Sequence, residues 1–170
     1  MDKLTKTLAY NGIVAALYIV ITMLIQPIAF LGLQFRLPEM FNHLVVFNKK
    51  FFFGIVLGVF IANLFFSPLQ WLDLIFGVGH TVISLAITIW IGRRVKNVWA
   101  RMMINAFIFS FMMFIIAFEL ELAEILVDLE NPLSFAQNWG IMAIGEFIVM
   151  AITAPIIYAI DKKVKFAEKL

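Results

Sequence analysis

Apolar runs long enough to cross a membrane recur along this chain, and they constrain its fold more than any other feature. A transmembrane helix needs about 20 mostly apolar residues. Stretches of that kind, such as GIVAALYIVITMLIQPIAF, alternate with small groups of charged residues. Only 14% of the residues are charged, whereas soluble domains carry about 25%. We therefore expect an all-α integral membrane protein with one transmembrane domain over residues 1–170.

The hydropathy pattern predicts six transmembrane helices. The predicted spans are 8–30, 37–47, 51–66, 72–91, 98–127 and 139–160. The second has an apolar core of about 11 residues, or about 16 Å at the helical rise, so we expect a short helix that its neighbours shield from lipid. A five-span alternative treats this segment as a loop. The fifth span is long and is expected to project past the outer surface.

The basic residues give the spans an orientation. With six spans, twelve of the 13 basic residues lie on one side of the membrane, and only Arg36 lies on the other. The positive-inside rule makes the basic side cytoplasmic, so both termini are predicted to be cytoplasmic. Five spans would place Lys49 and Lys50 outside, and we therefore prefer six.

Polar side chains within the spans concentrate towards the predicted outer side. Six of them are Arg36, Glu39, Asn42, Asn63, Asp73 and Glu146. An ionisable group in hydrocarbon is costly unless it faces the bundle interior or a cavity, so it indicates a functional site by default. The pattern therefore predicts a pocket that opens outward.

Several of these residues also have a structural interpretation. Arg36 and Glu39 are three residues apart and can pair with each other. Asp73 can cap the helix that it opens, and Asn63 can hydrogen-bond across helices. Glu146 has no such alternative, because it lies inside an apolar helix without a basic residue nearby in sequence.

The remaining polar and aromatic residues have simpler interpretations. His43 and His80 are expected to pack or hydrogen-bond, because no spacing links them to further metal ligands. Trp71 and Trp139 suit an interfacial aromatic belt, although Trp139 also shares a helical face with Glu146. Five acidic residues are expected to form a solvated outer rim: Glu119, Glu121, Glu124, Asp128 and Glu130.

The motifs of common enzymes are missing from the sequence. It has no GxxxxGK[ST] phosphate loop, no HExxH pair and no cysteine, so it predicts neither nucleotide hydrolysis nor a metal or thiolate site. We expect no enzymatic activity, no cofactor and no metal. An outward pocket without an energy source favours capture of a solute.

Two segments of the sequence resemble the queuosine-precursor transporter (QueT) family. They are GIVAALYIVIT and LQFRLPEMFNHLVVFNKKFFFGIVLGVFIANLFFSPLQWLDLIFGVGHT. The resemblance runs from about Gly12 to Thr81 and continues more weakly through the sixth span. The run QFR followed three residues later by Glu is fairly specific when it is combined with IANLF-SP-x-x-x-x-D-x-x-FG.

The resemblance implies a substrate-binding S component of an energy-coupling factor (ECF) transporter in the cell membrane. Such a protein captures a deazapurine base, such as prequeuosine or queuine, and depends on a transmembrane T subunit and two cytoplasmic ATPase subunits. No nucleic acid is implied as a partner. The pair Gly12 and Ala16 allows close helix approach, and the resemblance implies that this face meets the T subunit.

The implied ligand has a flat ring, a guanine-like donor edge and, in the aminomethyl precursor, an ammonium group. Carboxylates can accept from the edge and pair with the ammonium, while aromatic faces stack on the ring. The expected substrate contacts are Arg36, Glu39, Asn42, Asn63, Asp73, Phe76, Trp139 and Glu146. These acids favour a cationic ligand over an anionic vitamin.

Two alternatives to this prediction remain. The first is an S component for another small vitamin, such as riboflavin or thiamin. The second is an intramembrane enzyme in which Glu146 and His80 form an acid–base pair.

Overall fold

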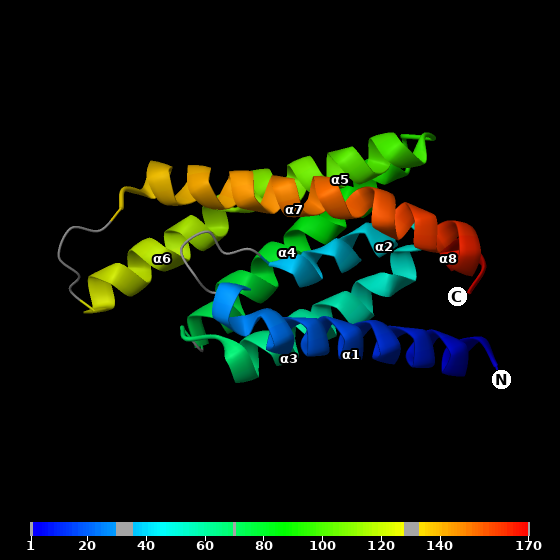
Figure 1. The fold of residues 1–170 in the computed structure, drawn as a ribbon, viewed down its shortest axis with the longest axis horizontal. Coiled ribbons are helices and arrows are strands. Elements are labelled where there is room, and N and C mark those ends of the chain that lie inside the picture. Colours follow the sequence, from blue (N-terminus) through cyan, green and yellow to red (C-terminus); the bar gives the residue numbers. More distant parts are fainter. Residues whose placement is uncertain (1, 30–35, 70, 128–132, 170) are drawn as a thin grey trace.

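Every regular element is a helix within residues 2–29, 36–69, 71–127 and 133–169, the part of the chain that the computed structural model describes. The long helices are α1 (Lys3–Ala29), α3 (Phe52–Phe66), α4 (Trp71–Gly92), α5 (Val98–Met112), α6 (Phe114–Val127) and α7 (Phe135–Val164) (Figure 1). The short ones are the 3₁₀ helices η1 (Leu37–His43) and η2 (Lys49–Phe51), and the helices α2 (Leu44–Phe47) and α8 (Phe166–Lys169).

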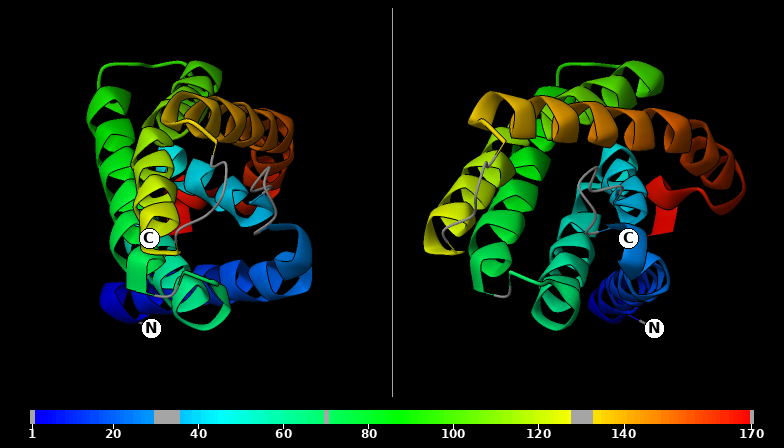
Figure 2. Two further views of the ribbon diagram at one scale, coloured as in Figure 1. Left: turned by 90° about the vertical axis from the view of Figure 1, so that its left-hand side faces the viewer. Right: turned by 60° about the vertical axis from the view of Figure 1, so that its left-hand side comes forward.

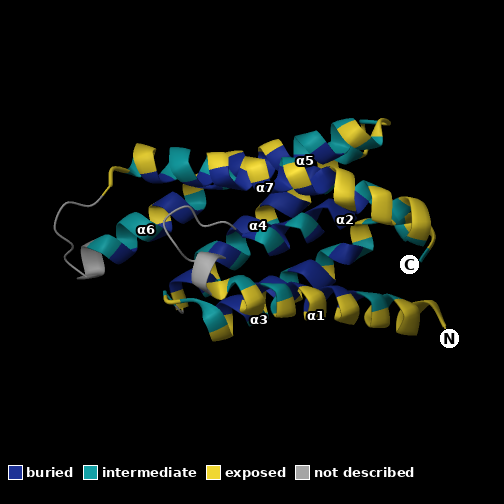
Figure 3. Cartoon of the chain, viewed as in Figure 1, coloured by how far each residue is buried: buried dark blue, intermediate teal, exposed yellow. Residues whose placement is uncertain are grey.

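Five helical stretches are long and apolar enough to cross a membrane. They are Lys3–Gln26, Lys49–Phe66, Trp71–Gly92, Val98–Glu124 and Phe135–Val164. Exposed positions alternate with buried ones along α1 and α7 (Figure 3), and large apolar side chains such as Leu24 and Ile144 are among the exposed ones. Such faces suit lipid, so the all-α membrane fold is confirmed, while the count of six crossings stays a prediction.

The second predicted span lies in the middle of the bundle, with α1, α4 and α7 around it (Figure 2). It consists of seven residues of η1 followed by four of α2. A 3₁₀ helix rises about 2.0 Å per residue and an α-helix about 1.5 Å, so the segment is about 20 Å long. Most of its side chains are buried. It is therefore the expected short, shielded helix, stretched by its 3₁₀ part.

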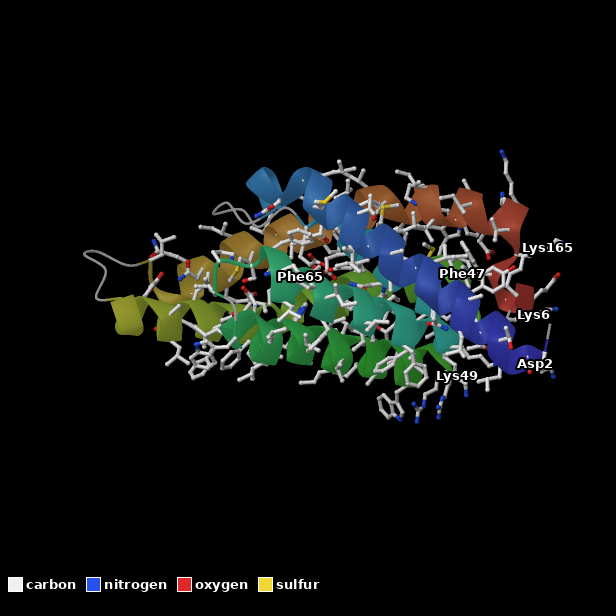
Figure 4. The ribbon with its side chains drawn as sticks, turned by 90° about the horizontal axis from the view of Figure 1, so that it is seen from below. Asp2, Lys6, Phe47, Lys49, Phe65 and Lys165 are labelled. Carbon is white, nitrogen blue, oxygen red and sulfur yellow. The ribbon has the colours of Figure 1, made fainter. Side chains whose placement is uncertain are left out.

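Both termini lie at the same end of the bundle (Figure 1). Lys6, Lys49 and Lys165 gather at that end, although they come from three distant parts of the sequence (Figure 4). This distribution agrees with the charge asymmetry on which the predicted orientation rests. The cytoplasmic location of this end is still a prediction.

The predicted fifth span is two helices instead of one, and they meet at Met113. The N–H of Met113 donates to Ser110 O at 3.3 Å, so a tighter turn replaces the regular α-helical pattern there. The carbonyl of Phe109 accepts from His80 Nε2 at 3.1 Å. Nearby, the carbonyl of Phe111 accepts from Trp139 Nε1 at 3.0 Å. Side chains from α4 and α7 thus satisfy backbone groups beside the break.

Close packing of α1 on α3 depends on two glycines one turn apart. The N–H of Gly54 donates to Asn11 Oδ1 at 2.6 Å, and a Cβ on Gly54 would lie 2.6 Å from Asn11 O. A Cβ on Gly58 would lie 2.8 Å from Tyr18 Cβ. Small residues let membrane helices approach this closely, and here they set the position of Tyr18.

We expect Gly54→Ala to lower stability, because the added methyl group meets backbone atoms of α1 that cannot rotate away. Overpacking of this kind costs about 1–3 kcal/mol. The matched control is Gly79→Ala in α4, where an added Cβ has nothing within 4 Å. Thermal unfolding in detergent should show a lower midpoint for Gly54→Ala only. Equal midpoints for the two variants would show that the α1–α3 contact is not tight.

Candidate functional site

One face of η1 brings together three polar residues that recur every third position: Arg36, Glu39 and Asn42. Arg36 is the N-cap of this helix, and the other two lie within it. A 3₁₀ helix has about three residues per turn, so side chains at i and i+3 eclipse each other. Asn42 Nδ2 donates to Glu39 Oε2. An α-helix would turn Arg36 and Asn42 to different faces. The proline at the first turn, Pro38, suits this start because its backbone has no N–H to satisfy there.

The carboxylate of Glu39 is fully occupied by two donors from different elements. Its Oε2 accepts from Asn42, and its Oε1 accepts from Tyr18 Oη at 2.8 Å. Tyr18 reaches this position because Gly58 leaves room for it on α3. Glu39 is only 1% exposed, so these bonds replace the water that the carboxylate loses.

Asp73 forms a second occupied carboxylate at the start of α4. Its Oδ1 lies 3.5 Å from Arg36 Nη2, and its Oδ2 accepts from Ser67 Oγ. Its backbone carbonyl accepts from Asn63 Nδ2 at 2.9 Å. Gly77 makes room for this amide, since a Cβ there would lie 2.6 Å from Asn63 Nδ2.

These contacts decide between the structural interpretations of the sequence. Arg36 pairs with Asp73 and not with Glu39. Asp73 is not the N-cap of α4, because that helix begins two residues earlier at Trp71. The expected cross-helix hydrogen bond of Asn63 is present, and it joins α3 to α4.

Two further carboxylates are buried without a hydrogen-bond partner among the described residues. Glu119 on α6 is 0% exposed and Glu146 on α7 is 1% exposed, and all four of their oxygens lack a donor. The same holds for the acceptor Oδ1 of Asn42 and the donor Nε of Arg36. Leaving a buried polar group unsatisfied costs about 1–3 kcal/mol, and more for a charge. Such a group therefore indicates a missing partner.

The prediction of a solvated rim is wrong for Glu119. This residue lies three positions after Ile116 and four before Ala123, and all three are buried. It therefore belongs to the inward stripe of α6, a helical spacing that the sequence contains. Glu121 and Glu124 are half-buried, whereas positions 128 and 130 of the predicted rim lie outside the described residues.

The four carboxylates form two pairs that share one cation. Glu146 lies within electrostatic reach of Glu39 and Arg36. Glu119 lies within reach of Asp73 and Arg36. Each pair thus contains one carboxylate with donors and one without. Ionisation of all four carboxylates beside one guanidinium would leave an excess of negative charge, which a cationic ligand would offset.

The two predicted aromatic contacts have different surroundings. Phe76 lies three residues after Asp73 on α4, half-buried, with its ring centroid 5.9 Å from that of Phe118. Trp139 bonds to Phe111 O and packs on the Phe111 ring at 5.6 Å. The structure therefore places Phe76 near the carboxylates and packs Trp139 against α5.

Both histidines hydrogen-bond to backbone carbonyls, as expected. His43 Nε2 lies 2.9 Å from Met150 O, and His80 Nε2 lies 3.1 Å from Phe109 O. A carbonyl only accepts, so each Nε2 carries the proton. Over the part of the chain that is described, no three His, Asp or Glu residues gather in a way that could hold a metal.

Two cavities lie away from the carboxylates. One, of about 240 Å³, is lined in part by Lys49, Arg93 and Arg101, whose charges disfavour a cation. The other, of about 380 Å³, is apolar apart from Ser110 and includes Trp139 in its wall. Neither offers the acceptors that a polar cationic base needs, so the carboxylate cluster is the better candidate site.

A family model described as the QueT transporter matches residues 8–162. The chain belongs to the QueT transporter family. A relative from Lactococcus lactis subsp. cremoris (strain MG1363), named "Queuosine precursor transporter QueT", is 35% identical over 162 residues, which cover 90% of each chain. No solved structure gives a significant match.

Membership of the QueT transporter family identifies the chain as a multi-pass membrane transporter and not an enzyme. The alternative of an acid–base pair formed by Glu146 and His80 is therefore wrong. The hydrogen bonding of His80 is consistent with this conclusion, because its Nε2 donates to the backbone carbonyl of Phe109.

We expect Arg36→Gln to destabilise the protein strongly, because it leaves the carboxylates without their cation. Removing one partner of a buried ion pair costs about 3–5 kcal/mol. The double variant Arg36→Gln/Asp73→Asn should recover part of this loss, since it also removes one negative charge. Thermal unfolding in detergent measures both effects.

The matched control combines Arg36→Gln with Glu121→Gln, which removes a half-buried carboxylate from α6. This second double variant should show no recovery. Strictly additive losses in the Arg36–Asp73 cycle would mean that the two side chains are not energetically coupled.

Proposed function

We propose that the chain is the S component of an ECF importer that takes up a queuosine precursor, a deazapurine base such as prequeuosine or queuine. The name of the Lactococcus relative supports the class of substrate. The observation that carries the proposal is the pair of buried, unpartnered carboxylates, Glu119 and Glu146. They lie in a cluster with an excess of negative charge, which a donor-rich cationic base would complement.

The unsatisfied atoms of the cluster are mostly hydrogen-bond acceptors, which complement the donors of such a base. Five are acceptors: two oxygens of Glu119, two of Glu146 and Oδ1 of Asn42. One, Nε of Arg36, is a donor. A deazaguanine edge offers a ring N–H, an amino group and a carbonyl, so it needs mainly acceptors and one donor. Glu146 can accept from the ring N–H and the amino group, Asn42 from the second amino hydrogen, and Arg36 can donate to the carbonyl.

Phe76 is proposed to stack on the base. Stacking on an aromatic side chain contributes about 1–3 kcal/mol per base. Its half-buried ring is positioned by the same turn of α4 that carries Asp73. Trp139 is not included in this proposal, because its ring and its N–H are both engaged with α5.

Six membrane crossings with cytoplasmic termini form part of the proposal. The η1–α2 segment is proposed as the second crossing, shielded by α1 and α7. Two observations support this topology: the termini share one end of the bundle, and lysines from three segments gather there (Figures 1 and 4). The whole chain would then form one transmembrane domain whose site faces outward.

The face of α1 that carries Gly12 and Ala16 is proposed to contact the T subunit. Both residues are exposed, and a Cβ on Gly12 would meet nothing within 4 Å. The inner face of α1 is formed instead by Asn11, Ala15 and Tyr18. Packing within the bundle therefore does not explain the small residues at positions 12 and 16, whereas a partner helix does. Two ATPase subunits would supply the energy.

We expect Glu146→Gln to weaken binding of aminomethyl-deazaguanine to the purified protein by at least about tenfold, because the amide presents a donor where the base also donates. Glu39→Gln should also weaken binding, because its single amide oxygen can accept from only one of Tyr18 and Asn42, and both bonds orient the site. Glu121→Gln is the matched control and should bind normally. A thermal-shift titration can measure all three, with riboflavin and thiamin as competing ligands. Unchanged affinity in both site variants, or a preference for either vitamin, would refute the proposed substrate.

We expect uptake in cells to require the T and ATPase subunits and to be lost in Gly12→Leu/Ala16→Leu. Ligand binding by this isolated variant should be intact, because neither position packs inside the bundle. Gly79→Leu/Ala86→Leu is the matched control, with the same residue changes on α4, and should transport normally. Loss of binding in the α1 variant, or ATP-dependent accumulation by the chain alone in liposomes, would contradict the proposal.

A further inference from the structure

Glu119, like Glu146, is a carboxylate of the cluster to which no described side chain donates. It is 0% exposed, and neither of its oxygens has a donor within the described ranges. Its neighbour Asp73 already has Arg36 on one oxygen and Ser67 on the other. Arg36 is also shared with Glu146. Within the described ranges, Glu119 therefore shares the guanidinium of Arg36 with Asp73 and Glu146 and has no cation of its own.

The two halves of the cluster offer different chemistry to a ligand. Asn42 bonds to Glu39, so its unsatisfied acceptor Oδ1 belongs to the Glu146 half. Arg36, with its unsatisfied donor Nε, is shared by both halves. That mixed set suits the edge of a ring, which carries both donors and an acceptor. On the carboxylates of the Glu119 half, the unsatisfied atoms are the two oxygens of Glu119, because both oxygens of Asp73 are occupied. An ammonium group has three donors and no acceptor, so it suits the Glu119 half.

Apolar surroundings strengthen this distinction. Ile116 and Ala117 precede Glu119 on α6 and are fully buried. The rings of Phe76 and Phe118 pack against each other at 5.9 Å, and they are three residues from Asp73 and one residue from Glu119. An ion pair is stronger where water is excluded than at the surface.

We propose that Glu119, with Asp73 beside it, forms a subsite for the ammonium group of the ligand and makes the transporter selective for amine-bearing bases. This rests on the proposed function, which brings a deazapurine to the cluster with its edge on Glu146. A competing explanation is that Glu119 shares a proton with Asp73 and never contacts ligand.

The experiment compares two bases that share a ring. Aminomethyl-deazaguanine carries the ammonium, and methyl-deazaguanine lacks it. Their affinities are measured on the purified wild-type protein and on three variants: Glu119→Gln, Glu119→Asp and the control Glu121→Gln. Wild type and Glu121→Gln should prefer the amine by at least about tenfold. Glu119→Gln should bind the two bases about equally, while its affinity for methyl-deazaguanine is kept.

Glu119→Asp retains the carboxylate and should keep part of the preference for the amine-bearing base. Because this variant is measured separately, the test does not depend on the folding of Glu119→Gln alone. A preference for the amine that survives in Glu119→Gln supports the shared proton and overturns the inference. Equal binding of both bases by wild type overturns the inference but leaves the proposed function standing. Binding of neither base by wild type overturns the proposed function itself, and the inference with it.

Discussion

One guanidinium among four buried carboxylates is the interaction on which this structure depends. Arg36 bonds to Asp73 and lies within electrostatic reach of both Glu119 and Glu146. In a low-dielectric interior each of these charges must be compensated nearby, and the described side chains supply only part of that compensation. The elements η1, α4, α6 and α7 are therefore held around a centre that is electrostatically incomplete, and the proposed cationic ligand would complete it.

The backbone around this centre uses local departures from regular α-helix to arrange it. The 3₁₀ winding of η1 aligns Glu39 with Asn42 and also lengthens a segment that is short for a membrane. At the break, the N–H of Met113 bonds to Ser110 O, so the carbonyl of Phe109 is free to accept from His80. This hydrogen bond joins α5 to α4, the helix that carries Asp73. Gly58 and Gly77 leave room for Tyr18 and Asn63. Each departure positions a side chain that acts on a carboxylate or on the helix that carries it.

Much of the fold could be predicted from the sequence, because hydropathy and charge placement are strong signals in membrane proteins. The shielded second segment and the convergence of Arg36, Glu39, Asp73 and Glu146 were accessible in this way. The partner of Arg36 was not, because i,i+3 spacing favours Glu39 and only the tertiary fold brings in Asp73. For Glu119, the four acids that follow it in the sequence favour a solvated rim. The helical spacing of Ile116, Glu119 and Ala123 is consistent with a buried Glu119. The sequence alone does not show which face of α6 points inward, so this spacing does not decide the question.

Under the proposed function, the incomplete centre would also let the site discriminate against purines that lack an amine. Guanine presents a similar edge to Glu146 and Asn42, but it brings no cation to the other half of the cluster. It would leave Glu119, which is already buried and without a donor, unpaired, and so would gain nothing from that half of the cluster. Sites that hydrogen-bond a particular group discriminate strongly against analogues without it. An amine-bearing base would supply the missing partner, so the unpaired carboxylate of the empty protein would become the source of selectivity when the proposed ligand binds.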